Sequence, residues 1–304
     1  MKNFLTILDA ESEELEEIIN LAAALKKERF TSVRTPLAGK SIALIFEKSS
    51  TRTRVSFEVG VKELGGHPLF LSKGDMQLGR GEPIKDTARV LSRYVQGITL
   101  RTYEHSRLLE LADYSTVPVI NALTDTHHPC QIMADVLTFY ERFGKFKGVK
   151  VAYIGDGNNI AHSWANAAAR FGFNLAIASP AECAPSRDIL NSAMDEAKKS
   201  GGRIEYTTDA KGAASNADVI TTDVWASMGQ EAEAERKKSF LEPFQVNRAL
   251  MAIAAPHAIF MHCLPAHIGE EVTEDIFESE ASAVFDEAEN RLHVQKAIMS
   301  KLFL

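Results

Sequence analysis

The sequence predicts an α/β protein made of two doubly wound domains, each built on a parallel sheet. Short apolar runs of strand length alternate with amphipathic stretches of about ten to fifteen residues along most of the chain. This alternation is typical of βαβ units, whose crossover helices cover both faces of a parallel sheet. The 304 residues are many for one hydrophobic core and suit two domains of ordinary size.

The first half of the chain opens with a helix and then alternates strand and helix. In that helix, apolar residues recur at helical spacing from Leu15 to Leu25, and Asp9 or Ser12 can cap its start. Four apolar runs of strand length follow, with helical patterns around them. The predicted strands are 41–46, 67–72, 97–101 and 117–122, and the helices that follow them include 82–94, 106–113 and 130–143.

The pattern pauses on glycines and lysines at residues 143–150 and then restarts. We therefore predict a first domain over 1–145 and a second over 146–287, with a last helix over about 288–304 that begins near Asn290. The second half repeats the alternation of the first. Its predicted strands are 149–155, 174–179, 203–208, 218–224 and 259–264, and its clearest helices are 164–171 and 188–200.

Composition excludes several classes of protein. Lys and Arg number 34 against 41 Asp and Glu, a net charge of −7, which argues against nucleic acid as a partner but allows a local anion pocket. Three cysteines (Cys130, Cys183 and Cys263) imply no disulfide framework and favour a reducing compartment. An acidic N-terminal stretch and the lack of about 20 consecutive apolar residues predict a soluble, cytoplasmic protein without a membrane segment.

The segment Ser50–Arg54, with the sequence STRTR, is the densest chemical signal in the first half. It follows a predicted strand, where the turn into a helix presents free N–H groups and the positive end of the helix dipole. The hydroxyls and the two guanidiniums there would make a phosphate cradle, since arginine matches phosphate oxygens bidentately. The alternative is a capped helix with exposed arginines. No Walker pattern occurs, which weakens an ATPase interpretation.

Two more features of the first half lie at strand ends, where open parallel sheets bind ligands. Arg101 ends one strand, and His128 to Gln131 open a helix after another; a histidine and a glutamine there can donate hydrogen bonds to a carbonyl oxygen. His127, His128 and Cys130 match no zinc spacing. The five-residue spacing of His257, His262 and His267 is equally unsuited to a metal, so we expect none.

In the second half, residues 155–159 (GDGNN) occupy the position of a dinucleotide fingerprint but lack its third glycine, so their amides can instead bind a polar substrate. Asp223 follows a strand near Ser227 and a glycine turn, which suits an amino acid's ammonium and carboxylate; an ordinary helix cap is the alternative. Cys263 ends a strand and would be a nucleophile only beside a base. The charged segment 229–242 is either a solvated helix or a lid.

Taken together, these motifs resemble the transcarbamoylase family, in its ornithine-using branch, over essentially the whole chain. HPCQ at 128–131 and HCLP at 262–265 favour that branch over the aspartate-using one. Any one motif is weak, whereas the ordered set is specific. The matching segments are 50–54, 75–94, 127–131, 155–160, 223–229, 262–265 and 288–291. The resemblance implies a carbamoyl-phosphate domain, a Rossmann-like ornithine domain, a last helix that returns to the first domain, and a homotrimer or multiple of trimers with active sites at subunit interfaces.

The resemblance also implies the site residues and the reaction, which is carbamoyl transfer from carbamoyl phosphate to the δ-amine of L-ornithine, without metal or cofactor. His128 would share polarisation of the carbamoyl oxygen with Thr53 and Arg101, and Cys263 would lie beside the attacking amine. The implied ligands of carbamoyl phosphate are Ser50, Thr51, Arg52, Thr53, Gln77 of a neighbouring subunit, Arg101, His128, Gln131, Cys263, Leu264 and Arg291. Those of ornithine are Asn159, Asp223, Ser227 and Met228.

Three other functions stay open at this point. Putrescine, an acetylated ornithine or aspartate could be the acceptor, the chain could be an NAD-dependent Rossmann enzyme, or it could be a binding protein without catalysis. The incomplete glycine pattern speaks against the dehydrogenase. The full set of candidate catalytic residues speaks against a binding module.

Overall fold

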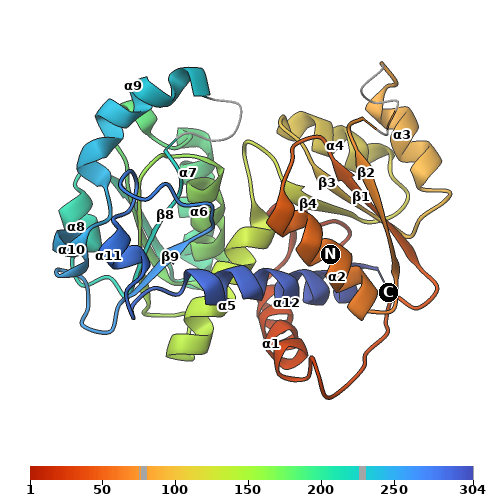
Figure 1. The fold of residues 1–304 in the computed structure, drawn as a ribbon, viewed down its shortest axis with the longest axis horizontal. Coiled ribbons are helices and arrows are strands. Elements are labelled where there is room, and N and C mark those ends of the chain that lie inside the picture. Colours follow the sequence, from red (N-terminus) through yellow and green to blue (C-terminus); the bar gives the residue numbers. More distant parts are fainter. Residues whose placement is uncertain (75, 77–80, 226–230, 304) are drawn as a thin grey trace. The chain divides into compact units, whose positions relative to one another are not determined.

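The computed structural model describes residues 1–74, 76, 81–225 and 231–303, except the side chains of 231–234. The chain forms two compact units (Figure 1): unit 1 is Met1–Leu137 with Glu289–Leu304, and unit 2 is Thr138–Ala288. The predicted boundary at 145/146 lies just beyond helix α5 (Pro129–Phe143), whereas the division falls inside that helix. The glycines and lysines at 143–150 mark the end of helix α5. The units are defined by which residues pack together, and the division between them falls inside α5.

Unit 1 is a parallel four-stranded sheet in the order β2-β1-β3-β4, with helices in the connections. Strands β1, β3 and β4 are mostly buried, as in a parallel sheet that helices cover on both faces, whereas β2 is only half-buried. Its strands are β1 (Ser41–Phe46), β2 (His67–Ser72), β3 (Gly97–Arg101) and β4 (Val119–Leu123); its helices are η1 (Ile7–Asp9), α1 (Ser12–Lys27), α2 (Thr51–Glu63), α3 (Ile84–Leu91), α4 (His105–Tyr114), the first part of α5 and most of α12 (Val284–Leu302).

Unit 2 is a parallel five-stranded sheet in the order β7-β6-β5-β8-β9. Its strands are β5 (Lys150–Ile154), β6 (Asn174–Ala178), β7 (Arg203–Thr207), β8 (Val219–Thr222) and β9 (Ile259–His262). Its helices include α6 (Asn159–Phe171), η3 (Ala181–Cys183), α7 (Arg187–Ser200), α8 (Ala210–Ala214), α9 (Glu231–Leu241), η4 (Glu242–Phe244), α10 (Arg248–Met251) and α11 (Glu274–Phe277). The two parallel sheets confirm the predicted fold class.

Two helix starts differ from the sequence-based expectation. Helix α12 begins at Val284 rather than near Asn290, because Asn290 is fully buried and its Oδ1 accepts from Lys26 Nζ at 2.8 Å instead of ending a helix. Asp9 caps an earlier turn, where its Oδ2 accepts from Thr6 N–H at 2.9 Å, and α1 starts after Glu11. Among the described residues, no helix combines the length and apolarity that crossing a membrane requires.

Gln295 on α12 gives a stability prediction. Its side chain is fully buried, and neither amide atom has a hydrogen-bond partner among the described residues. An unsatisfied buried amide costs about 1–3 kcal/mol, so Gln295→Met should raise the thermal midpoint by about 2–4 °C in calorimetry. Gln131→Met is the matched control: this buried amide donates to Asp135 at 2.8 Å, so the same change there should lower the midpoint. A midpoint lowered by both variants would contradict the prediction.

Candidate active site

Each sheet has one point where the strand order reverses, and open parallel sheets bind ligands there, at the carboxyl ends of the strands. In unit 1 the reversal lies between β1 and β3, and in unit 2 between β5 and β8. The segments that leave these four strands begin with Glu47, Thr102, Gly155 and Asp223. The predicted motifs STRTR, GDGNN and DVWASMG therefore follow switch-point strands, and Arg101 ends one.

Helix α2 starts at the STRTR motif, as the sequence predicts. Ser50 is its N-cap, and its Oγ accepts from Thr53 N–H at 3.3 Å. The two guanidiniums do not act alike: Arg54 pairs with Glu58 at 2.9 Å and lies 3.5 Å over the Phe70 ring, so it is already engaged on the flank of the helix. Arg52 and Thr51 are exposed at the first turn. Of the two arginines of the motif, Arg54 thus has partners within unit 1, and Arg52 remains the predicted phosphate ligand.

Arg291, on α12, joins two predicted ligands in unit 1. Its guanidinium donates to Thr53 Oγ1 at 3.3 Å and to Gln131 Oε1. All three side chains are at most 4% exposed, so they form a rigid group of donors and acceptors at the starts of α2 and α5. We call Thr53, Arg101, His128, Gln131 and Arg291, with Ser50 at the cap, the anion cluster.

Arg101 is held in place by hydrogen bonds to Glu47 and Lys48, the two residues that follow β1. Its Nε donates to the backbone oxygen of Lys48 at 3.2 Å, while Glu47 N–H donates to Arg101 O at 2.9 Å. Lys48 is itself buried, with Nζ 3.3 Å from Asp125. Lys48 is not among the residues predicted for the site, although its position between the end of β1 and the STRTR motif is a signal in the sequence.

The electrostatic field in the anion cluster is positive. Burial lowers the pKa of the His128 imidazole well below its ordinary value, and the nearby charges of Arg291, Arg101 and Lys48 lower it further. His128 is therefore a neutral ring that can take part in hydrogen bonding without carrying charge. Three cations around a neutral histidine suit an anionic ligand whose oxygens accept hydrogen bonds.

This depressed pKa predicts acid sensitivity of the fold. The unfolded chain binds a proton on His128 near pH 6.5, whereas the folded chain does so only at lower pH, so stability is lost as the pH falls below about 6.5. The thermal midpoint of His128→Asn should fall less than that of the wild type between about pH 7 and about pH 5. His67→Asn, at an exposed position, is the control. Parallel midpoint curves for wild type and His128→Asn would refute the assignment.

In unit 2, residues 183–185 pack directly against the GDGNN turn. A Cβ at Gly157 would lie 2.2 Å from Pro185 N and 2.4 Å from Cys183 O, so only glycine fits there. In a dinucleotide fingerprint the corresponding glycine lets a pyrophosphate approach the backbone. Here residues 183–185 fill that space, which argues against an NAD-dependent enzyme. Asn158 caps α6, and Asn159 is buried at its first position.

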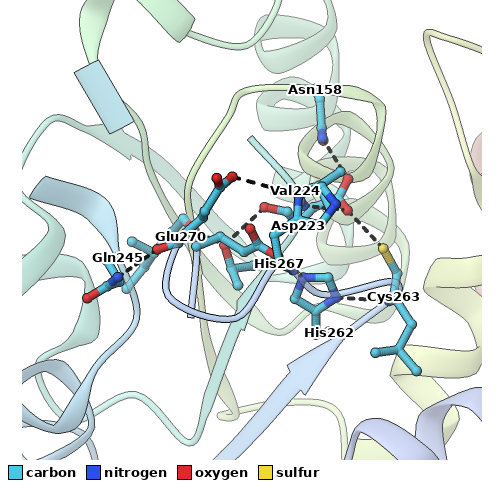
Figure 2. A network of polar contacts seen from close by, with 12 residues as sticks. Asn158, Asp223, Val224, Gln245, His262, Cys263, His267 and Glu270 are labelled. Atoms are coloured by element: carbon cyan, nitrogen blue, oxygen red, sulfur yellow. Dashed lines mark hydrogen bonds and ion pairs between the residues drawn. The ribbon is translucent and has the colours of Figure 1, made fainter. Parts of the chain in front are cut away.

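The Asp223 carboxylate lies at the centre of a polar network (Figure 2). Its Oδ2 accepts from Asn158 Nδ2 at 2.7 Å. Its Oδ1 accepts from Val224 N–H at 2.8 Å and from Cys263 Sγ at 3.0 Å. The side chain is 6% exposed, so these hydrogen bonds are made in a largely desolvated place. We call Asn158, Asn159, Asp223 and Cys263 the Asp223 cluster; a buried carboxylate with donors from its own chain can accept one more from a cationic ligand.

The HCLP segment after β9 presents Cys263 and the Leu264 backbone. His262 Nε2 lies 3.1 Å from Glu271 Oε1, both fully buried, and His262 Nδ1 accepts from Leu264 N–H at 2.8 Å. Leu264 has φ = 60°, a left-handed conformation rare outside glycine. Burial raises the pKa of the Cys130 thiol to about 12 and that of Cys183 to about 11, so these two are inert, whereas Cys263 is partly exposed and engaged with Asp223.

The charged segment predicted as 229–242 contains helix α9. Lys237 forms an ion pair with Asp156 of the GDGNN turn at 2.8 Å, and Lys238 pairs with Glu270 at 3.0 Å. The helix is thus tied to the turn that carries the predicted substrate amides, more than a free solvated helix would be. The predicted ligands Gln77, Ser227 and Met228 lie outside the described residues.

The three histidines spaced by five do not converge on one point. His257 contacts Asp218 at 2.7 Å, and His262 contacts Glu271. His267 Nδ1 lies 3.7 Å from Glu270, in a group with Glu271 whose possible ligand atoms are within 4.8 Å of one another. Both carboxylates already have partners in the chain, Lys238 for Glu270 and His262 for Glu271.

Comparison with known proteins decides the family. The model of the aspartate/ornithine carbamoyltransferase carbamoyl-P binding domain matches residues 2–141, and that of the Asp/Orn binding domain matches residues 147–302. The chain belongs to the aspartate/ornithine carbamoyltransferase family. It is 54% identical over 302 residues to an ornithine carbamoyltransferase of Anoxybacillus flavithermus, covering 99% of this chain and 96% of the relative.

Two solved structures of the same family are similar to the whole chain. The ornithine carbamoyltransferase of Pyrococcus furiosus has a TM-score of 0.95 and 50% identity, covering 98% of this chain and 96% of that one. The anabolic ornithine carbamoyltransferase of Campylobacter jejuni has a TM-score of 0.93 and 45% identity, covering 99% of each chain. The carbamoyltransferase interpretation from the motifs is thereby confirmed at the level of family and fold.

Proposed function

We propose that this chain is an ornithine carbamoyltransferase, which converts carbamoyl phosphate and L-ornithine into L-citrulline and phosphate. The positive field around the neutral His128 carries this proposal for the phosphate side. The desolvated Asp223 carboxylate supports it for the amino-acid side. The relatives reported above share this activity in name, and the Campylobacter jejuni enzyme is described as anabolic, which supports a role in arginine biosynthesis.

In the proposed mechanism, the neutral δ-amine of ornithine attacks the carbamoyl carbon and forms the C–N bond while negative charge develops on the carbamoyl oxygen. The C–O bond to phosphate then breaks, and an oxygen of the departing phosphate takes the proton that the amine loses. Donors aimed at the carbamoyl oxygen, from Thr53, Arg101 and His128, stabilise the charge where it forms. We assign the phosphate to Ser50, Thr51, Arg52, Thr53 and Arg101, the orientation of the carbamoyl group to Gln131, Arg291, Cys263 and the Leu264 carbonyl, and the α-amino and α-carboxylate ends of ornithine to Asn159, Asp223, Ser227 and Met228.

Cys263 acts as a polar neighbour of the amine in this mechanism, not as a nucleophile. Its thiol donates to Asp223, and amine attack needs no covalent intermediate. A colorimetric citrulline assay with carbamoyl phosphate tests the whole proposal. Ornithine should be a much better acceptor than putrescine, which has no α-carboxylate, and acetylated ornithine and aspartate should be poor. A higher kcat/KM for any of these three amines would overturn the choice of substrate.

We also propose a homotrimer, or a multiple of trimers, in which Gln77 acts in a neighbour's site. Gln77→Ala and Arg52→Ala would then damage different sides of one site, and mixed trimers would each contain one native site. Random mixing makes three-quarters of the trimers mixed, with one native site in three, so about a quarter of full activity should return. The two variants would be unfolded, combined, refolded and assayed for citrulline; activity no higher than their average would contradict the shared site.

A further inference from the structure

We propose that Asn158 is a positioning residue for the reaction: it begins helix α6 and also orients the Asp223 carboxylate toward the α-ammonium of the substrate. This inference rests on the proposed function, in which Asn159 and Asp223 contact ornithine and Asn158 has no role. Asn158 lies on the turn after β5, and Asp223 lies on the turn after β8, at the switch point of the unit 2 sheet. Figure 2 shows the contact between the two side chains.

The two ends of the Asn158 amide have different partners, which fixes its orientation. Oδ1 accepts from Ile160 N–H at 2.9 Å and Ala161 N–H at 3.4 Å, the second and third amides of α6, while the buried Tyr153 hydroxyl lies 3.2 Å from Oδ1 and donates to Asp156 O at 2.7 Å. With two backbone donors at Oδ1, the amide nitrogen is the atom that faces Asp223. Nδ2 donates to Asp223 Oδ2 at 2.7 Å.

The hydrogen bond from Asn158 is made to Oδ2, the carboxylate oxygen that Val224 and Cys263 do not contact. Val224 N–H and Cys263 Sγ both donate to Oδ1, whereas Asn158 holds Oδ2. Without the Asn158 donor, the buried Oδ2 would lose the hydrogen bond that compensates its desolvation, and the carboxylate would be held through Oδ1 alone. Because Asn158 is held in place as the N-cap of α6, its hydrogen bond fixes the orientation of the Asp223 carboxylate toward an ammonium group.

A purely structural role as helix cap is the competing explanation, and serine separates the two. Asn158→Ser keeps a good capping oxygen but has no amide to reach Asp223. Asn247→Ser is the matched control, because Asn247 caps α10 in the same way, accepting from Ala249 N–H at 3.0 Å and Leu250 N–H at 3.3 Å. If the serine variant does not fold, Asn158→Asp keeps both the shape and the cap and replaces the donor with an acceptor.

We expect Asn158→Ser to lower kcat/KM for ornithine by about 10- to 100-fold, the range for one hydrogen bond to a charged group. Phosphate affinity by calorimetry should stay unchanged, and the thermal midpoint should shift no more than in Asn247→Ser, which should keep full activity. Asn158→Asp should lose at least as much activity as Asn158→Ser.

The decisive measurement is a double-mutant cycle with Asp223→Asn. If Asn158 acts through Asp223, adding Asn158→Ser to Asp223→Asn should cause no further loss of kcat/KM. Additive losses, or an equal loss of phosphate affinity, would overturn the positioning role while leaving the proposed function standing. A wild-type protein that forms no citrulline would overturn the proposed function and, with it, this inference.

Discussion

Replacing Arg52 with alanine should lower kcat/KM for carbamoyl phosphate by about 10²- to 10³-fold, the usual effect of removing one preorganised transition-state donor. Arg52 is exposed at the first turn of α2, where the helix dipole and the free N–H groups already favour an anion. Its guanidinium can follow the charge that moves onto the departing phosphate, which makes the loss larger in kcat than in ground-state binding. Steady-state citrulline assays at varied carbamoyl phosphate measure both parameters.

Arg54→Ala is the matched control for this prediction. It removes the same charge two residues away, but from a side chain engaged with Glu58 and the Phe70 ring. Its kcat/KM should stay within a small factor of the wild type. Equal losses in both variants would mean that net positive charge at this end of α2, rather than contact by Arg52, is what matters.

Asp223→Asn should weaken the binding of norvaline, an ornithine mimic without the δ-amine, by about 100-fold. The change leaves the shape of the side chain intact but removes the charge that faces the α-ammonium, and losing one partner of a desolvated charge pair typically costs about 2–5 kcal/mol. Calorimetry in the presence of phosphate gives the affinity directly. Phosphate binding itself should hardly change.

Asp218→Asn provides the control at the other end of the same strand. Asp218 precedes β8 and accepts from Lys150 N–H and His257, each at 2.7 Å, while Asp223 follows β8. The same loss of charge there should leave norvaline affinity unaltered. A comparable fall in both variants, or equal falls for norvaline and phosphate in Asp223→Asn, would remove Asp223 from the amino-acid site.

The strands were the most predictable part of the fold. The predicted runs 41–46, 67–72 and 97–101 coincide with β1, β2 and β3. β1 and β3 are buried at nearly every position, so their mostly apolar runs mark the strands, whereas β2 is only half-buried and has an exposed His67. The start of α12 was not predictable in the same way. Asparagine is a residue type common at helix ends, and the burial of Asn290 and its contact with Lys26, far away in the sequence, belong to the tertiary structure.

The positions of the site residues could be predicted, but their contacts could not. Motifs at strand ends identify the switch points because topology brings those ends together. The direction of a side chain depends on its neighbours in three dimensions. Arg54 contacts Glu58 and the Phe70 ring. Asn158 caps a helix and also donates a hydrogen bond to Asp223. The order of the strands within each sheet could not be predicted from the local hydrophobic pattern either.

The return of the last residues to unit 1 has a consequence for how the protein matures on the ribosome. Unit 2 is contiguous in the chain and can fold as soon as it has emerged, whereas unit 1 lacks Glu289–Leu304 until all of unit 2 has been synthesised. Arg291, which donates to Thr53 and Gln131, therefore appears only after unit 2. Domains that emerge first commonly fold first during translation. Here unit 1 is completed only by a segment that follows unit 2, so a nascent chain stalled before Arg291 would lack a cation of its anion cluster.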